Sequence, residues 1–167
     1  MQKNNLWIGI AILLATTACS QGGHLGLGGE DIATTAERHE GSHNWDYDGV
    51  WKCNRFVYDV LKETGVTAPV YSADGERIID GKNRDDLNPV VSADWANSRV
   101  RIPDWDHLGK TGRRRGDVIA IRDRSDDATG HCGIAVSSSQ VIAATSDGVT
   151  RSQGGKLRNG SVRRYTG

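Results

Sequence analysis

The sequence has no excess charge of either sign, since its 167 residues include 21 Lys and Arg and 21 Asp and Glu. A neutral chain lacks the basic footprint that binds nucleic acid, and the short run Arg113–Arg115 does not supply one, so we expect no nucleic-acid partner. The sequence also lacks internal repeats, and its length allows one compact domain but not two. With three cysteines and no C-x-x-C pair, it lacks the usual spacing of zinc ligands. We expect neither a metal nor a cofactor.

Long hydrophobic runs are also missing, apart from one at the N-terminus. The run Leu6–Ala15 follows Lys3 and has ten residues, too few to span a bilayer but enough for the core of a signal peptide. Small residues then lead to Ala18. We therefore expect residues 1–18 to be a signal peptide and the protein to be exported, to the periplasm or to the outer membrane as a lipoprotein.

Cys19 follows the predicted cleavage site and resembles the lipidated cysteine of bacterial lipoproteins. Thr16 stands where that pattern prefers Leu, so lipidation of Cys19 is left open. A lipid there would be the protein's only contact with a membrane. The glycine-rich segment 19–30 predicts a flexible linker, which places the folded domain at 31–167.

A buried helix is predicted immediately after Cys53. Phe56, Val57, Val60 and Leu61 recur at helical spacing, and Gly65 has the position of a C-terminal cap. Cys53 is therefore expected at the first turn of this helix.

The rest of the domain predicts a sheet that follows the helices. A short helix is expected at 31–39 and one helical turn at 92–96. Four strands are expected, at 117–122, 133–137, 140–145 and 161–165, with a polar loop at 123–130. This order predicts an α+β domain, with the cysteine-bearing helix packed on an antiparallel sheet.

Cys53 and His131 are the candidate catalytic pair. The thiolate is the reactive form of cysteine, and a helix N-terminus or a neighbouring imidazolium lowers the pKa of a thiol. His131 follows Gly130 at the start of an apolar strand, where it can face a helix N-terminus. The other four histidines lie in polar or glycine-rich segments that predict solvated side chains: His24, His39, His43 and His107.

Three blocks carry a resemblance to a known group of enzymes. The segments 52–61 (KCNRFVYDVL), 115–120 (RGDVIA) and 130–136 (GHCGIAV) resemble the NlpC/P60 and CHAP superfamily of cysteine peptidases, and are similar to bacterial amidase effectors. The resemblance covers about 45–165 in order, but nothing in 71–94 matches.

The resemblance implies a papain-like fold and a peptidoglycan hydrolase, either an endopeptidase or an amidase. It makes Cys53 the nucleophile, His131 the general base and the Cys53 backbone N–H part of an oxyanion hole. Tyr47 and Trp51, in an aromatic loop before the cysteine, are the candidate substrate-binding residues. Peptidoglycan is then the expected partner, and a protein inhibitor is a further candidate.

The third catalytic residue stays open. The position on the next strand that orients the histidine in such enzymes falls at Ala143, which cannot do so. Asp147, just past the strand end, is our candidate because a carboxylate fixes the histidine tautomer. Thr145, a backbone carbonyl or a water could serve instead.

The main alternative concerns Cys132. Two cysteines of an exported domain normally pair, which would block Cys53 and leave a non-catalytic, wall-binding lipoprotein. Strand alternation argues against a bridge, because it turns Cys132 to the face opposite His131. We therefore expect Cys132 to be a small buried residue, and we expect no zinc site built from these side chains.

Overall fold

The computed structural model describes residues 28–81, 84–125 and 128–167. The predicted signal peptide, Cys19 and most of the predicted linker lie outside these residues. No described helix has the length and apolar character needed to cross a membrane. The first helix, α1 (Gly28–Arg38), begins within the end of the segment predicted as linker.

The second helix, α2 (Cys53–Thr64), begins at Cys53, as the apolar stripe predicts. Its stripe residues Phe56, Val57, Val60 and Leu61 are fully buried, each contributing about 1.5–3 kcal/mol of transfer free energy. Gly65 ends the helix with a left-handed φ of 76°, which glycine adopts without steric cost.

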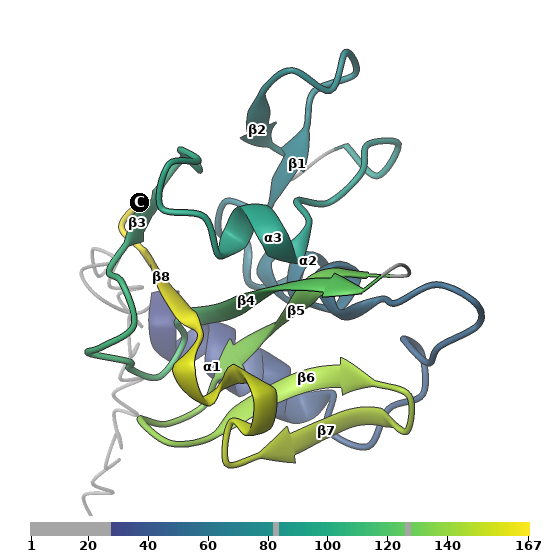
Figure 1. Ribbon diagram of the computed structural model, residues 1–167, viewed down its shortest axis with the longest axis vertical. Coiled ribbons are helices and arrows are strands. Elements are labelled where there is room, and N and C mark those ends of the chain that lie inside the picture. The colour runs from purple at the N-terminus through teal and green to yellow at the C-terminus, as the bar shows by residue number, and fades with distance from the viewer. Residues whose placement is uncertain (1–27, 82–83, 126–127) are drawn as a thin grey trace, which may run out of the picture.

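The α+β class is confirmed. A six-stranded antiparallel sheet has the order β3-β8-β4-β5-β6-β7. Its strands are β3 (Trp105–His107), β4 (Val118–Ser125), β5 (Ala128–Ala135), β6 (Val141–Thr145), β7 (Gly148–Ser152) and β8 (Ser161–Tyr165). A small hairpin, β1 (Pro69–Tyr71) with β2 (Ile78–Asp80), stands apart from the sheet, as Figure 1 shows.

The sheet has a core on each face. α1 and α2 cover one face, and the short 3-10 helix η1 (Gly155–Asn159) covers the other (Figure 1). Cys132 and Ile134 of β5 belong to the larger core with α2, whereas Ala135 belongs to the smaller core under η1. The sheet therefore separates two packing environments, and β5 contributes to both.

The predicted polar loop at 123–130 is wrong in its extent, because β4 and β5 continue through most of it as a long hairpin. Polar side chains at the exposed end of a hairpin give the same composition as a loop, so composition did not separate the two. Gly130 permits the pairing: its φ is +147°, and an added Cβ would lie 2.0 Å from the carbonyl oxygen of Ile121. His131 consequently lies within β5, opposite Ile121, rather than at its start.

Candidate functional site

Cys53 lies at the N-terminal end of α2. Lys52 precedes it in the N-cap position without any side-chain cap, and its carbonyl accepts the first helical hydrogen bond from Phe56. The first N–H groups of a helix have no acceptor within it, so those near Cys53 point toward the site unpaired by the helix. They can stabilise a thiolate, and they can bind the oxyanion of an acyl-transfer reaction.

The loop before Cys53 is fixed to the helix by Trp45. The Trp45 ring packs edge-on against Phe56, with centroids 5.3 Å apart, and its indole N–H donates to Asp59 at 2.8 Å. Lys52 Nζ also donates to Asp48 at 2.6 Å. These contacts determine the direction in which the chain enters α2 and thereby hold Cys53 in place.

A second polar group, Ser92, meets the sulfur from α3 (Ser92–Trp95). Ser92 is buried, and its hydroxyl oxygen lies 3.4 Å from Cys53 Sγ. The guanidinium of Arg163 in β8 holds the other end of this short helix. It donates to the carbonyl oxygens of Trp95 at 3.0 Å, Asn97 at 2.6 Å and Val100 at 2.8 Å. Arg163 thus fixes the position from which Ser92 reaches Cys53.

Cys132 belongs to the same cluster. The Ser92 hydroxyl also lies 3.3 Å from Cys132 Sγ, so its single proton can be donated to either sulfur, and Cys132 in turn lowers the pKa of Cys53. The expectation that Cys132 is a small buried residue is confirmed, but its position opposite His131 does not keep it away from Cys53, since Ser92 contacts both sulfurs. Strand alternation does turn it away from the face of His131, yet α2 packs on that opposite face and brings Cys53 against it. Both cysteines are free thiols.

The pKa values of the two thiols move in opposite directions. The pKa of Cys53 falls to about 4, chiefly through the hydrogen bond of the Cys132 thiol. Burial of Cys53 opposes this change and raises the pKa. His131, through a hydrogen bond and its charge, and the Ser92 hydroxyl lower it further. Burial raises the pKa of Cys132 well above its ordinary value, and the neighbouring Cys53 raises it further. At neutral pH the cluster therefore holds one thiolate and one thiol.

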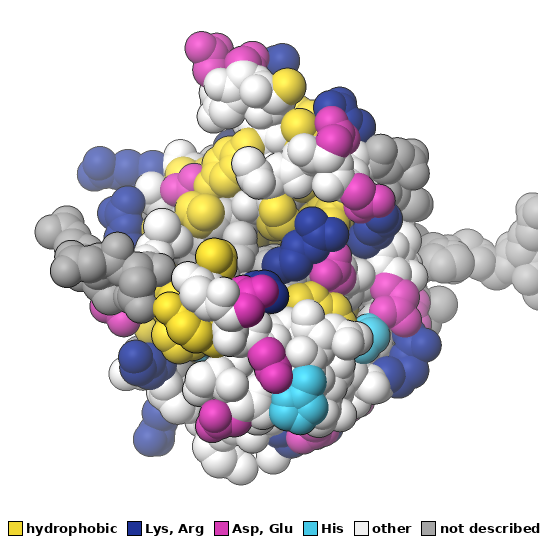
Figure 2. Space-filling view, turned by 90° about the vertical axis from the view of Figure 1, so that its right-hand side faces the viewer, with side chains coloured by type: hydrophobic (Ala, Val, Ile, Leu, Met, Phe, Trp, Pro, Cys, Tyr) yellow, Lys and Arg dark blue, Asp and Glu magenta, His cyan; other side chains and the backbone are white. Residues whose placement is uncertain are grey.

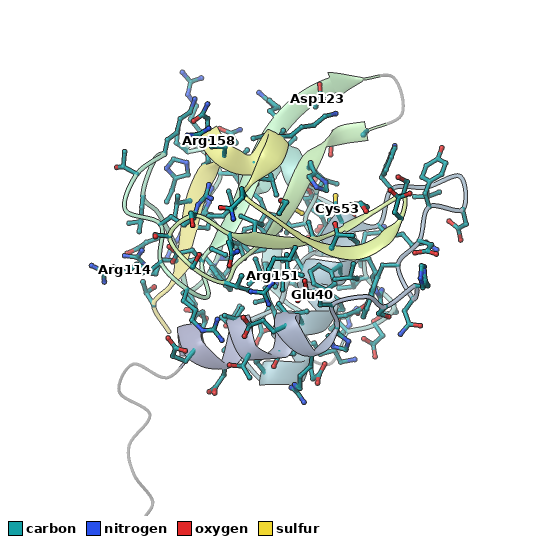
Figure 3. The ribbon with its side chains drawn as sticks, turned by 90° about the horizontal axis from the view of Figure 1, so that it is seen from below. Glu40, Cys53, Arg114, Asp123, Arg151 and Arg158 are labelled. Atoms are coloured by element: carbon teal, nitrogen blue, oxygen red, sulfur yellow. The ribbon has the colours of Figure 1, made fainter. Side chains whose placement is uncertain are left out.

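His131 reaches Cys53 from another direction. It interacts with the Cys53 sulfur and also lines a pocket of about 360 Å³ together with Asp123, Thr145 and Lys156. The structure thus brings together the two residues that the sequence singled out. In Figure 3 Cys53 lies inside the fold, and Asp123 lies farther out along the β4–β5 hairpin.

A second pocket lies beside Cys53. It has a volume of about 230 Å³, and its lining includes Cys53, Asn54, Ser92 and Thr129. Trp51, Ala128 and Gly130 line both pockets, so the two form neighbouring depressions along one surface.

Two further predicted site residues have other surroundings. Tyr47 is exposed and packs against the Trp51 ring, with centroids 4.6 Å apart, so it supports the position of Trp51. Asp147 is an exposed residue of the β6–β7 turn that accepts a hydrogen bond from Ser146 at 3.3 Å. Among the described residues it makes no hydrogen bond with His131, whereas Thr145 does share the pocket of His131. The third catalytic residue remains a prediction.

Sequence reasoning missed four residues of this site: Ser92, Cys132 as a partner of Cys53, Asp123 and Lys156. Ser92 opens the predicted helical turn at 92–96, but nothing in its local sequence indicates a contact with a cysteine 39 residues away. Asp123 and Lys156 stand in polar stretches that look like ordinary surface. The β4–β5 hairpin places Asp123 near His131, and the 3-10 helix η1 brings Lys156 to the same pocket.

The surface carries no large field of one sign on the face shown in Figure 2, where acidic and basic side chains are interspersed. Within the described ranges, no group of three or more His, Cys, Asp or Glu side chains is arranged to hold a metal ion. The side chains gathered at the site offer a thiolate, an imidazole and a hydroxyl group.

No family model matches the chain, and no curated protein or solved structure matches it either.

Proposed function

We propose that the protein is a cysteine hydrolase of papain-like fold that cleaves an amide bond in peptidoglycan, as an endopeptidase or an amidase. The observation that carries the proposal is the approach of His131 to the Cys53 thiolate at the N-terminus of α2, where each residue lines one of two neighbouring surface depressions. Peptidoglycan as the substrate rests on the three sequence blocks and on the predicted export.

The reaction has two steps in this site. The Cys53 thiolate attacks the carbonyl carbon of the scissile amide, and backbone N–H groups at the start of α2 bind the oxyanion. His131 gives a proton to the leaving amine, and then takes one from the water that hydrolyses the acyl-enzyme. His131 therefore has two tasks, since it helps to lower the pKa of Cys53 and it carries the proton for these transfers.

The two pockets fit an extended peptide with charged groups. Asp123 and Lys156 line the pocket on the His131 side, so it presents both signs of charge to a substrate. Stem peptides carry both amines and carboxylates, so an amine can pair with Asp123 and a carboxylate with Lys156. Trp51 offers an apolar surface between the two pockets.

Digestion of purified sacculi tests the proposal. Wild-type protein and the Cys53→Ala variant are incubated with the same sacculi, and the released fragments are analysed by mass spectrometry. The wild type is expected to release fragments with a new amine and a new carboxylate, whose masses identify the bond, and the variant is expected to release none. Equal release by both, or none by either, would overturn the proposal.

The non-catalytic alternative, a wall-binding lipoprotein with a locked Cys53, makes a different prediction. It requires Cys53 to be locked by Cys132 or otherwise inactive, whereas the structure holds both as free thiols. Alkylation of the unreduced, denatured protein tests the lock, and sacculus digestion after treatment with dithiothreitol tests activity: fragments released by the reduced protein favour the hydrolase, and their absence favours the alternative.

A further inference from the structure

Two thiols share one hydroxyl behind the first turn of α2. The Ser92 oxygen lies 3.4 Å from Cys53 Sγ and 3.3 Å from Cys132 Sγ. The sulfurs therefore lie close together in the core, although neither is bonded to the other. A hydrolase needs only the first of them as its nucleophile.

The two sulfurs differ in reactivity and in access. Cys53 is a thiolate at neutral pH, and the thiolate is the form that oxidants attack. It is 4% exposed and lines a pocket of about 230 Å³, which a small molecule can enter. Cys132 is 0% exposed and stays protonated, so an oxidant that enters the pocket meets Cys53 first.

We propose that Cys53 and Cys132 form an oxidation site, in which a hydroperoxide converts Cys53 to a sulfenic acid and Cys132 then closes an intramolecular disulfide. Cys132 is in this respect a resolving cysteine.

The atoms and electrons balance in two steps. The Cys53 thiolate attacks the peroxide, an S–O bond forms as the O–O bond breaks, and the alkoxide or hydroxide that leaves takes a proton from solvent. Cys132 then attacks the Cys53 sulfur, the S–S bond forms as the S–O bond breaks, and the departing hydroxide takes the Cys132 proton and leaves as water. Two thiols are oxidised by two electrons, and the peroxide is reduced.

The fold favours closure of this bridge. Cys53 begins α2 and Cys132 lies in β5, and both side chains belong to the same core cluster. The sulfurs already meet at one oxygen, so rotation of the two side chains is the motion that closure requires. Once formed, the disulfide would protect Cys53 from irreversible oxidation to the sulfinic acid. If the protein is the hydrolase proposed above, the same bridge switches hydrolysis off until a reductant opens it.

The test uses the full chain with Cys19→Ser, which removes the third thiol. The protein is treated with hydrogen peroxide, denatured, alkylated and digested without reduction, and its peptides are identified by mass spectrometry. We expect a peptide pair linked through Cys53 and Cys132, and dithiothreitol should return both thiols. Oxygen added to Cys53 while Cys132 remains alkylatable would overturn the proposal.

Two variants sharpen the test. At a pH at which its Cys53 is still ionised, Cys132→Val, which keeps a small apolar side chain in the core, should accumulate the sulfinic acid of Cys53, and dithiothreitol should not reverse it. Ser92→Ala keeps both sulfurs and should still form the disulfide. Should Cys132→Val fail to fold, the linked peptides of the parent protein decide the matter. None of these readouts depends on hydrolysis, so they stand or fall separately from the proposed function.

Discussion

The hydroxyl of Ser92 lies 3.4 Å from the sulfur of Cys53, although 39 residues separate the two in sequence. The same hydroxyl lies 3.3 Å from the sulfur of Cys132. Ser92 of the short helix α3 therefore links Cys132 of β5 to Cys53, the first residue of α2. The state of the Cys53 thiol therefore depends on the packing of three elements, and each can be tested separately.

Cys132 is predicted to set the pH range in which the protein hydrolyses its substrate. The thiolate is the active form, so kcat/KM should rise as pH rises through the pKa of Cys53, at about 4 in the wild type. Cys132→Val removes the donor that lowers this pKa most, so the acidic limb should move to higher pH. The pH profile of fragment release measures the shift.

The matched control is Cys132→Ser, whose hydroxyl can donate to the thiolate in the same place. It should keep the acidic limb near that of the wild type. If Cys132→Val and Cys132→Ser give the same profile as the wild type, Cys132 has no part in lowering the pKa of Cys53.

His131 is predicted to act on the substrate in addition to its part in lowering the pKa of Cys53. His131→Gln should lower kcat by about 10²–10⁴-fold, the usual contribution of a general acid and base. Cys53 should still be alkylated rapidly at neutral pH, because the largest lowering of its pKa comes from Cys132. Loss of both hydrolysis and thiolate reactivity in this variant would assign the ionisation to His131 instead.

Gly130 is predicted to be indispensable to the hairpin that carries His131. A Cβ there would lie 2.0 Å from the carbonyl oxygen of Ile121, and the φ of +147° disfavours any other residue. Gly130→Ala should lower the free energy of unfolding by more than about 3 kcal/mol, or prevent folding.

Gly109→Ala is the control for backbone strain alone. Gly109 also has a positive φ, +76°, but an added Cβ would meet nothing within 4 Å. Its cost should be about 1–2 kcal/mol. Urea unfolding of both variants gives the comparison, and equal losses would show that the close approach at Gly130 is unimportant.

Arg163 is predicted to hold Ser92 in the site from a distance. Its buried guanidinium donates to carbonyl oxygens at and beyond the end of α3, so Arg163→Met leaves these acceptors unpaired and should destabilise the protein by about 1–3 kcal/mol. It should also raise the pKa of Cys53, because Ser92 loses its fixed position. Arg99→Met, at an exposed site, should change neither quantity.

Much of the fold follows from local pattern. The stripe from Phe56 to Leu61 predicts α2, the left-handed Gly65 ends it, and the strand expected at 161–165 is present with the same bounds. The three-residue strands β1, β2 and β3 and the strand β7 were not predicted. Short segments carry too few residues to show an alternation, so the partner strand determines whether they become strands.

The site was predictable only in part, for a related reason. Cys53 and His131 lie in recognisable local settings, a helix start and a strand after a glycine. The contact of Cys53 with Cys132 was missed because alternation along β5 gives the face of a side chain but not which helix covers that face. Asp147 was predicted as the third catalytic residue because it is a carboxylate just past a strand end, but its side chain is exposed in the β6–β7 turn. Such contacts depend on tertiary packing, which no local pattern encodes.

The central claim is that the fold keeps Cys53 ionised at neutral pH. The most direct measurement is the rate at which iodoacetamide alkylates Cys53 of the native protein, followed by peptide mass spectrometry from pH 3 to pH 10. The account predicts that the rate rises through an inflection near the pKa of about 4 and is level at neutral pH. An inflection in the ordinary range of a cysteine, about 8–9, would contradict it.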